Sequence, residues 1–263
     1  MAIYSEINTL KRVIIHRPLE SLRRLTPSNC HELLFDDVLW PEKAAAEHDH
    51  FAQVLRDNGV EVLLLGDLLQ KTLTINEAKA YLINQMVNLQ YAGTKEGELL
   101  TQYLMHLEPA ELTKLIFGGM TYADLGGFSL GLCSKTANPN DFLFPPLPNH
   151  LFTRDSSFWI GEGVSINHMA YPARRGETAN MSAIYKYHPS FEKQKPKIWF
   201  DGSKADTPMP SIEGGDVLVI SKDCVLIGLG ERTKPQAVEK LANELFKHNA
   251  VTKVIAIELP KKR

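Results

Sequence analysis

The sequence predicts an α/β fold built from repeated strand–strand–helix–strand (ββαβ) units and interrupted by a helical insertion. Residues 155–200 and 216–258 share one order of apolar strands, turn, basic loop, helix and final strand. Residues 1–66 have the pattern of a strand, loop, helix and strand, and could be a looser copy. Three such units indicate a cyclic α/β array around a central site. The repeat alone does not fix how many units close the ring.

The N-terminal region contains the first expected strand, over residues 9–17, which Pro18 closes. Pro41 opens a helix at the position where proline is best tolerated, and Asn58-Gly59 ends it. Its expected apolar stripe consists of Phe51, Val54 and Leu55, and a buried strand follows over residues 60–65.

The residue pattern of 67–140 differs from that of the preceding segment, because it contains few runs of β-branched residues. This pattern predicts an all-helical insertion. Helices are expected at 76–87, 98–107 and 108–117, and the Asn- and Pro-rich stretch 134–146 is expected to be the return linker. We therefore expect two domains: an α/β domain of residues 1–66 with 141–263, and a helical domain of residues 67–140.

The two clear repeats place acids at the start of their first strand and an arginine after their second strand. In the first repeat these are Asp155 and Arg174; in the second, Glu213 and Asp216 precede the strand and Arg232 follows the next one. The helix of the second repeat shows apolar residues at helical spacing, with Thr233 as its expected cap: Val238, Leu241, Ala242, Leu245 and Phe246.

The recurring acids suggest a cationic ligand. Carboxylates bind a guanidinium in its planar fork, so Asp155 and Glu213 could grip one from two sides. Two nearby carboxylates raise each other's pKa, and a bound cation would relieve that strain. Arg174 and Arg232 could bind the anionic end of the same ligand, with Asn149 as a neutral partner. The implied ligand has a cation at one end and a carboxylate at the other, as arginine has.

Several alternatives remain open at this point. The Arg154-Asp155 pair could be structural, Gly214-Gly215 could be a bulge, and the arginines could be surface charges. Asp155 and Glu213 could also be the acid and base of a glycoside hydrolase, which is the most distant alternative because we expect no aromatic sugar platform beside these acids.

Composition excludes several other classes. At 263 residues and 44% apolar content the chain can bury a sizeable core, and a formal charge of −2 argues against nucleic acid or an anionic membrane as partner. No apolar run approaches the ~18 residues of a membrane span, and the start does not resemble a secretion signal. Three widely spaced cysteines suit a reducing compartment, so a cytoplasmic location is expected.

Metal and thiol chemistry receive no support from the sequence. His48 and His50 face different sides of the expected helix, and His150 and His168 lack partners at metal-ligand spacing, so no metal site is expected. Cys30, Cys133 and Cys224 lie in no context that would activate a thiol.

Taken together, the motifs resemble those of arginine deiminase, a member of the guanidino-group-modifying enzyme superfamily, essentially from end to end. The likeness rests on residues 25–29 (LTPSN), 34–40 (LFDDVLW), 151–155 (LFTRD), 167–169 (NHM), 173–178 (ARRGET), 213–217 (EGGDV) and 230–232 (GER). The resemblance implies a pentein-type propeller of five ββαβ modules, of which this chain would hold about three. A helical insertion distinguishes arginine deiminases from their dimethylarginine-hydrolysing relatives.

The resemblance also implies roles for individual residues. Asp155 and Glu213 would hold the substrate guanidinium, Phe152 would pack against it and Asp216 would lie close by. The substrate α-carboxylate would be held by Asn149, Arg174 and Arg232. The family reaction hydrolyses L-arginine to L-citrulline and ammonia through a cysteine-bound thiouronium intermediate, with a histidine-activated water and no cofactor.

The family's catalytic histidine, in a His-x-Asp motif, follows the segment that matches residues 259–263, and its nucleophilic cysteine comes later still. This chain is therefore expected to carry the substrate-binding residues named above, here called the substrate clamp. It is expected to lack the general-base histidine and the nucleophilic cysteine. Three hypotheses follow: a part of a deiminase that a C-terminal chain complements, a non-catalytic arginine-binding remnant, or the glycoside hydrolase above. An open ring would expose sheet edges, so self-association into a homo-oligomer is also expected.

Overall fold

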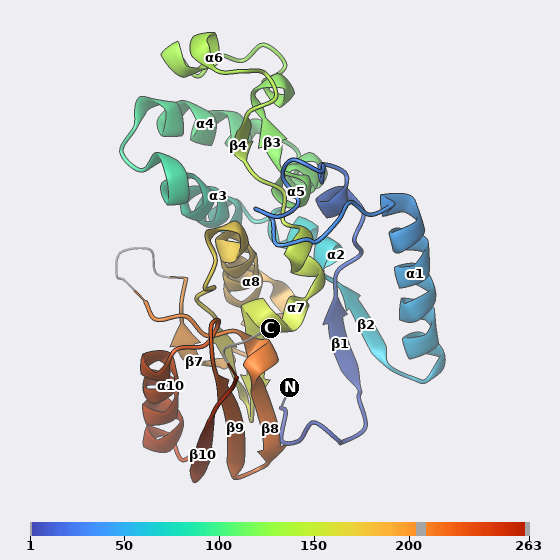
Figure 1. The fold of residues 1–263 in the computed structure, drawn as a ribbon, viewed down its shortest axis with the longest axis vertical. Coiled ribbons are helices and arrows are strands. Elements are labelled where there is room, and N and C mark those ends of the chain that lie inside the picture. Colours follow the sequence, from blue (N-terminus) through green and yellow to red (C-terminus); the bar gives the residue numbers. More distant parts are fainter. Residues whose placement is uncertain (1, 204–208, 261–263) are drawn as a thin grey trace. The chain divides into compact units, whose positions relative to one another are not determined.

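A computed structural model describes residues 2–203 and 209–260 of the chain (Figure 1). Contacts divide the chain into two compact units. Unit 1 comprises Met1–Leu10 and Phe152–Arg263, and unit 2 comprises Lys11–Leu151. Of the C-terminal segment matched by resemblance, residues 261–263 lie outside the described part.

Unit 1 contains the two predicted repeats as two modules with the same topology. In each module the first two strands are antiparallel, and the helix returns the chain to a third strand that is parallel to the second. The first module consists of β5 (Ser157–Ile160), β6 (Gly163–Ile166), α8 (Arg175–Tyr187) and β7 (Lys197–Asp201). The second consists of β8 (Val217–Ser221), β9 (Cys224–Leu229), α10 (Pro235–Lys247) and β10 (Lys253–Glu258). The predicted ββαβ repeat is therefore confirmed.

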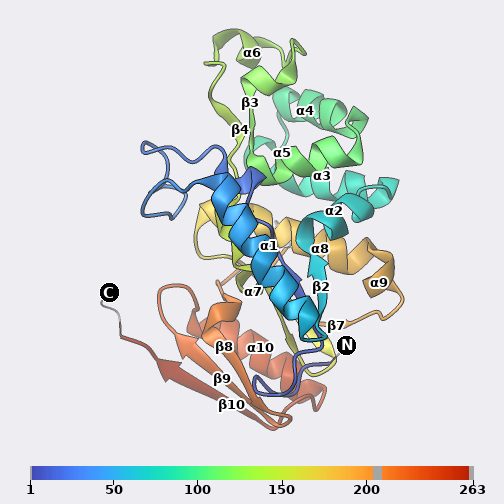
Figure 2. The same ribbon diagram turned by 90° about the vertical axis from the view of Figure 1, so that its right-hand side faces the viewer.

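One hydrophobic cluster joins the two modules of unit 1. Phe158 and Ile160 of β5 and Trp199 of β7 belong to the same buried cluster as the inward side chains of β8 and β9. Helix α10, which lies along the β8–β9–β10 sheet in Figure 2, contributes Ala237, Val238, Leu241 and Leu245. Of the predicted stripe of this helix, Val238, Leu241 and Leu245 are buried, whereas Ala242 is partly buried and Phe246 is 44% exposed.

Unit 2 begins with β1 (Arg12–Ile15), α1 (Pro41–Asp57) and β2 (Glu61–Leu64), and β1 pairs with β2 in parallel. This strand–helix–strand matches the last three elements of the repeat. The predicted stripe of α1 is wrong at Phe51 and Val54, which are both exposed. The helix instead buries the small side chains Ala45 and Ala52, which allow close packing.

The rest of unit 2 is mainly helical. Its helices are α2 (Leu65–Thr72), α3 (Asn76–Tyr91), α4 (Lys95–His106), α5 (Pro109–Gly118) and α6 (Leu132–Thr136). The expectation of an all-helical segment is wrong in one place, because β3 (Met120–Thr121) pairs antiparallel with β4 (Phe142–Phe144) in the predicted linker. Short helical turns complete the fold: η1 (Glu20–Leu22), η2 (Tyr122–Leu125), η3 (Pro148–Leu151), α7 (Thr153–Ser156), η4 (Pro172–Arg174), α9 (Pro189–Glu192) and η5 (Gly214–Asp216).

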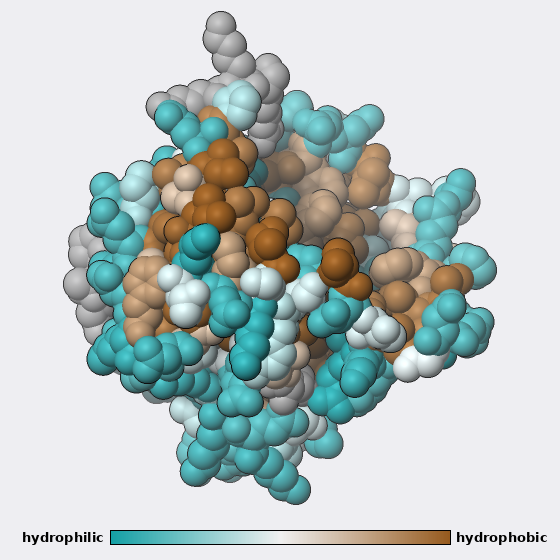
Figure 3. Space-filling model, turned by 90° about the horizontal axis from the view of Figure 1, so that it is seen from below, coloured by the Kyte–Doolittle hydropathy of each residue, from teal (hydrophilic) through white to brown (hydrophobic). Residues whose placement is uncertain are grey.

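Apolar side chains reach the surface in several places, as the brown areas of Figure 3 show. In unit 1 they include the face of the second sheet that points away from α10. Leu218 and Ile220 of β8 and Ile255 and Ile257 of edge strand β10 are all exposed there. Self-association through such surfaces stays a prediction. Within the described residues, no helix is long and apolar enough to cross a bilayer.

A buried histidine of unit 2 gives the first testable prediction. His16 is only 4% exposed and packs against Phe117 with ring centroids 4.4 Å apart. Burial, with a smaller contribution from the charge of His48, lowers the pKa of His16 from 6.5 to about 3. Below pH 6.5, His16 therefore binds a proton in the unfolded chain but not in the folded chain. The free energy of unfolding falls as the pH drops for this reason. Between pH 6.5 and 5 we expect a loss of roughly 2 kcal/mol from this residue.

Urea unfolding at pH 7 and pH 5 measures this loss. The variant His16→Phe should have a smaller difference between the two pH values than the wild type, whereas His50→Phe, at an exposed position of α1, should keep the wild-type difference. Equal pH dependence in all three proteins would contradict the assignment to His16.

Candidate functional site

The two predicted acids are held by short helical turns that precede the first strand of each module. Asp155 lies in α7, directly before β5, and Glu213 immediately precedes η5, which leads into β8. The expectation that the acids begin the strands is therefore wrong by a few residues.

Backbone contacts bring these two turns together. The Arg154 guanidinium donates from Nε to the Gly214 carbonyl oxygen (3.0 Å) and from Nη2 to that of Val217 (2.7 Å). The Gly215 backbone N–H donates to Asp155 Oδ1 at 3.0 Å. A Cβ on Gly214 would overlap the Arg154 carbonyl oxygen, so only glycine allows this approach. The Gly214-Gly215 pair is thus the junction between the modules.

Arg174 lies between the two acids. Its Nη1 donates to Asp155 Oδ2 at 2.9 Å and to Glu213 Oε2 at 3.2 Å. On its other side, Nε and Nη2 donate to the two carboxylate oxygens of Glu177, both at 2.9 Å. The Arg174 side chain is 3% exposed and that of Glu177 is 0% exposed. The chain itself therefore supplies a guanidinium at the place where the sequence suggested a ligand guanidinium.

Arg232 contacts the same acid from the outer side. Its Nη1 donates to Glu213 Oε2 at 3.0 Å, and its guanidinium carbon lies 4.5 Å from the ring centroid of Tyr171. The Arg232 side chain is 25% exposed, against 4% for Glu213. Its buried Nε has no hydrogen-bond acceptor within the described residues. Arg232 is thus held by fewer contacts than Arg174.

The remaining oxygens of both acids also accept hydrogen bonds. Asp155 Oδ1 accepts from Gly215 as described, and Glu213 Oε1 accepts from the Ala170 backbone N–H at 3.2 Å. Three carboxylates then face two guanidinium groups, which leaves one negative charge in excess. Such a cluster attracts one further cation.

Burial controls the pKa values in this cluster. Burial raises the pKa of Glu177 to about 7, against the lowering effect of Arg174. Burial likewise raises the pKa of Glu213, and the charges of Arg174 and Arg232 oppose that change only in part. For Arg174 the burial penalty is outweighed by Glu177 and Asp155, so its pKa is raised and it stays charged. As expected of two nearby carboxylates, Asp155 adds to the raised pKa of Glu213, and Arg174 and Arg232 offset this repulsion in part.

The other predicted residues are distributed as follows. Asp216 joins the site through Thr233, whose hydroxyl donates to Asp216 Oδ2 (2.6 Å) and accepts from the Glu213 backbone N–H (3.1 Å). Thr233 is therefore not the predicted helix cap; the N-cap of α10 is Lys234, without a side-chain cap. Phe152 is 52% exposed beside α7. Asn149 belongs to unit 2, where its side-chain amide donates to the Leu33 carbonyl oxygen.

Three contributors were not predicted from the sequence. Glu177 had a detectable signal, since it lies three residues after Arg174 at the start of an expected helix, where opposite charges meet. Tyr171 and Thr233 had none, because an aromatic or hydroxyl side chain before a helix is common. Their contacts depend on elements 17–61 residues away in sequence.

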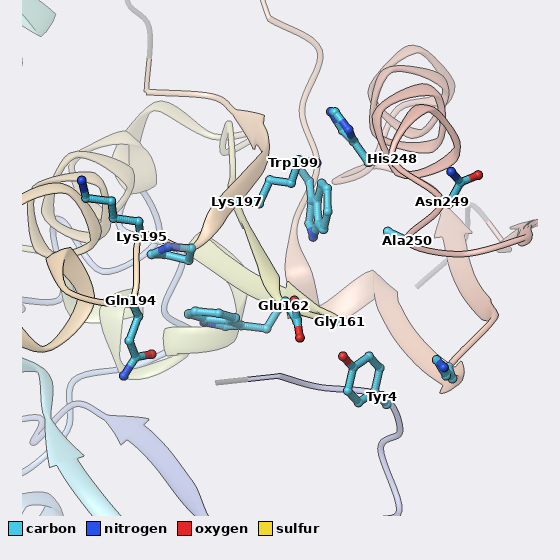
Figure 4. Close-up of a pocket in the computed structure, with 13 residues that line it drawn as sticks. Tyr4, Gly161, Glu162, Gln194, Lys195, Lys197, Trp199, His248, Asn249 and Ala250 are labelled. Carbon is cyan, nitrogen blue, oxygen red and sulfur yellow. The ribbon is translucent and has the colours of Figure 1, made fainter.

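A cavity of about 640 Å³ lies elsewhere in unit 1 (Figure 4). It is lined by Gly161 and Glu162 of the β5–β6 turn, Lys222 of the β8–β9 turn, and Trp199 and His248. These turns are at the far ends of β5 and β8 from Asp155 and Glu213. None of the predicted site residues lines this cavity. The described residues also contain no group of three histidine, cysteine or acidic side chains that could hold a metal ion.

Comparison with known proteins identifies a family and several structural neighbours. A family model described as arginine deiminase matches residues 31–263. Among solved structures, the amidinotransferase SxtG from Microseira wollei covers 98% of this chain and 62% of its own length, with 14% identity and a TM-score of 0.50. A DDAH from Pseudomonas aeruginosa complexed with citrulline covers 97% of this chain and 63% of its own, with 15% identity and a TM-score of 0.49.

The likeness to the amidinotransferase concerns the fold alone, which is α/β in this chain. Within the described residues each sheet has two or three strands and none closes into a ring. The chain spans less than two thirds of the length of these solved structures. The family match, in contrast, runs over most of the sequence. This chain therefore belongs to the arginine deiminase family.

Proposed function

We propose that unit 1 binds L-arginine, and that this chain carries the substrate clamp of an arginine deiminase. One observation carries the proposal: Asp155 and Glu213, from corresponding places in two modules, converge on one guanidinium nitrogen, that of Arg174. The pair thus has the spacing that a guanidinium needs. The excess negative charge of the cluster favours a further cation.

The proposed roles follow the family likeness and this geometry. Asp155 and Glu213 hold the substrate guanidinium, Phe152 packs against it and Asp216 supports the site from behind through Thr233. The family likeness assigns the substrate α-carboxylate to Arg174, Arg232 and Asn149. The complete enzyme would hydrolyse L-arginine to L-citrulline and ammonia through a cysteine-bound thiouronium intermediate.

The proposal also concerns the architecture. We place this chain as about three of five ββαβ modules, with residues 1–66 and 141–263 in the propeller and 67–140 as an inserted helical domain. The remaining modules would supply the nucleophilic cysteine and the general-base histidine. Citrulline formation after addition of a protein that carries both residues would distinguish these deiminase modules from the rival function.

The rival is a protein that binds arginine without catalysis. The position of Cys224 favours it, because this thiol begins β9 next to the β8–β9 turn, at the far end of the module from Glu213. The cysteine of unit 1 therefore cannot attack a guanidinium held by the two acids. Both functions require the same binding step.

Calorimetric titration with L-arginine tests that step. The purified chain should release heat of binding, and Asp155→Asn should weaken affinity by roughly 10- to 100-fold, because one charge-assisted hydrogen-bond partner of the guanidinium is lost. Asp223→Asn, the same change in the exposed β8–β9 turn, is the matched control and should bind like the wild type.

The same samples, assayed for citrulline, should contain none. Absence of binding heat in the wild type, or equal affinity in Asp155→Asn, would contradict the proposed function. Citrulline formed by residues 1–263 alone would contradict the assignment of the catalytic cysteine and histidine to modules outside these residues.

A further inference from the structure

We propose that Tyr171 is a positioning residue: its aromatic ring holds the Arg232 guanidinium beside the acids and leaves the guanidinium N–H groups for a ligand carboxylate. This inference rests on the proposed function and deepens it, because it names a residue that selects guanidine ligands that also carry a carboxylate. Tyr171 lies between the motifs 167–169 and 173–178 and belongs to neither of them.

The backbone of Tyr171 is restricted by the next residue in sequence. A residue that precedes proline is confined to extended conformations, and Tyr171, which precedes Pro172, has φ −100° and ψ 136°. Its carbonyl oxygen accepts from the Arg174 backbone N–H at 3.0 Å, at the turn η4. The Tyr171-Pro172 pair therefore gives the tyrosine a defined backbone conformation at the site.

The segment that precedes Tyr171 is attached to the residues that lead into η5. The Ile212 backbone N–H donates to the His168 carbonyl oxygen at 3.0 Å, and the Ala170 backbone N–H donates to Glu213 Oε1 at 3.2 Å. Both contacts join the first module to the second within three residues of Tyr171. The tyrosine is therefore held beside the second module by its neighbours on the chain.

Arg232 meets this ring from the second module. Its guanidinium carbon lies over the Tyr171 ring, 4.5 Å from the centroid, which is within the range of a cation–π contact. Such a contact uses the face of the ring and takes up none of the guanidinium N–H groups. Within the described residues the guanidinium donates one hydrogen bond, from Nη1 to Glu213, and its buried Nε has no acceptor. The ring thus holds Arg232 while most of its donors remain available.

Available donors beside a pair of acids favour one class of ligand. A carboxylate accepts parallel hydrogen bonds from a guanidinium whose plane is already held in place. A ligand with a guanidinium for the two acids and a carboxylate for the arginines fits both ends of the proposed site. Without the ring, the Arg232 side chain must lose rotational freedom when it binds the carboxylate, and that entropy weakens the complex. Tyr171 should therefore raise the affinity for L-arginine and leave that for agmatine, which lacks the carboxylate, unchanged.

Calorimetric titrations with L-arginine and with agmatine test this selection. Tyr171→Leu, which keeps an apolar side chain and removes the ring, should weaken arginine binding by about three- to tenfold, the size of a single cation–π contact, and leave agmatine binding unchanged. Tyr171→Phe should bind both ligands like the wild type, because the Tyr171 hydroxyl makes no hydrogen bond within the described residues. Tyr4→Leu, at a 38% exposed position of the same unit, is the matched control and should also bind like the wild type.

A double variant decides whether the ring acts through Arg232. In Arg232→Gln the preference for arginine over agmatine should fall, and adding Tyr171→Leu should lower it no further. A ring that contacted the ligand directly would lower arginine affinity again in the double variant. A ring that only stabilised the fold would lower affinity for both ligands. Either of these results, or a wild-type preference in Tyr171→Leu, would overturn the inference.

A readout without ligand separates this inference from the proposed function. Protons above the face of an aromatic ring are shielded, so the Arg232 Nε–H resonance, assigned by its loss in Arg232→Lys, should lie upfield in the ¹H–¹⁵N spectrum of the wild type. It should stay upfield in Tyr171→Phe and return to the ordinary range in Tyr171→Leu. An ordinary position in the wild type overturns the inference even if arginine binds.

An upfield resonance that Tyr171→Leu abolishes, in a protein that binds no arginine, supports the positioning of Arg232 and refutes the proposed function. If Tyr171→Leu does not fold, the wild type decides the matter by itself. Its Arg232 resonance should then lie upfield and should move when L-arginine, but not agmatine, is added. The same response to both ligands would overturn the inference.

Discussion

Replacing Arg174 by methionine is expected to destabilise the protein by about 3–5 kcal/mol, which is a large part of the roughly 5–15 kcal/mol that a folded domain has in total. Methionine keeps the aliphatic stem but removes the charge. Glu177, which is completely buried, then loses the guanidinium it pairs with, and Glu213 keeps only the partly exposed Arg232. Their carboxyl groups must take up protons to remain inside, so the pKa of each rises further in the variant.

The pH dependence identifies this cause. In Arg174→Met the folded state binds protons more tightly than the unfolded state, so its stability should improve as pH falls and worsen as pH rises. Urea unfolding at pH 5.5 and pH 8 measures the difference. Arg175→Met, the same substitution at the neighbouring exposed position, should change stability by less than about 0.5 kcal/mol.

A double variant completes the test. Arg174→Met combined with Glu177→Leu replaces the buried ion pair by apolar groups and should recover part of the lost stability, because no unpaired charge remains from that pair. If Arg174→Met unfolds at the wild-type urea concentration at pH 8, the three carboxylates are not held by this guanidinium.

Substituting Gly214 by alanine should have the second-largest effect, a loss of about 3 kcal/mol. The added Cβ would overlap the carbonyl oxygen of Arg154 and approach Phe158 Cδ1 at 3.1 Å. The first obstacle is backbone, so no side-chain rotation relieves it. The turn that carries Glu213 must then move away from the turn that carries Asp155, and arginine binding should be lost with the stability.

Gly230→Ala is the matched control, because a Cβ at Gly230 meets nothing within 4 Å. It should be neutral or slightly stabilising, since alanine restricts the unfolded chain more than glycine does. Thermal and urea unfolding of both variants, with an arginine titration of each, decide the matter. Equal stability of the two variants would show that the modules do not meet as closely as described.

The repeat was readable from the sequence because its signals are local. Apolar runs of four to six residues separated by short turns predicted β5, β6, β8 and β9, and helical spacing at Val238, Leu241 and Leu245 predicted α10. Corresponding places in the two repeats also indicated that Asp155 and Glu213 act together. These signals need only neighbours along the chain, which is why they survive without knowledge of the fold.

The predictions that were wrong depend on the surroundings of a side chain in the folded protein. Phe51 and Val54 have the spacing of a buried stripe but are exposed, because α1 packs through Ala45 and Ala52. Thr233 precedes a helix, as a capping residue would, but its hydroxyl bridges Glu213 and Asp216. In both cases the residue type suited two environments, and contacts with other elements selected one of them.

By itself, the sequence determined the α/β class, the ββαβ repeat, the family and the two acids that converge. Only the tertiary structure decided which cation lies between them. Arg174 is 19 residues from Asp155 and 39 from Glu213 in sequence, and Glu177 competes for the same guanidinium. Because Coulomb energies and burial depend on distances in space, sequence positions could nominate the charges but could not pair them.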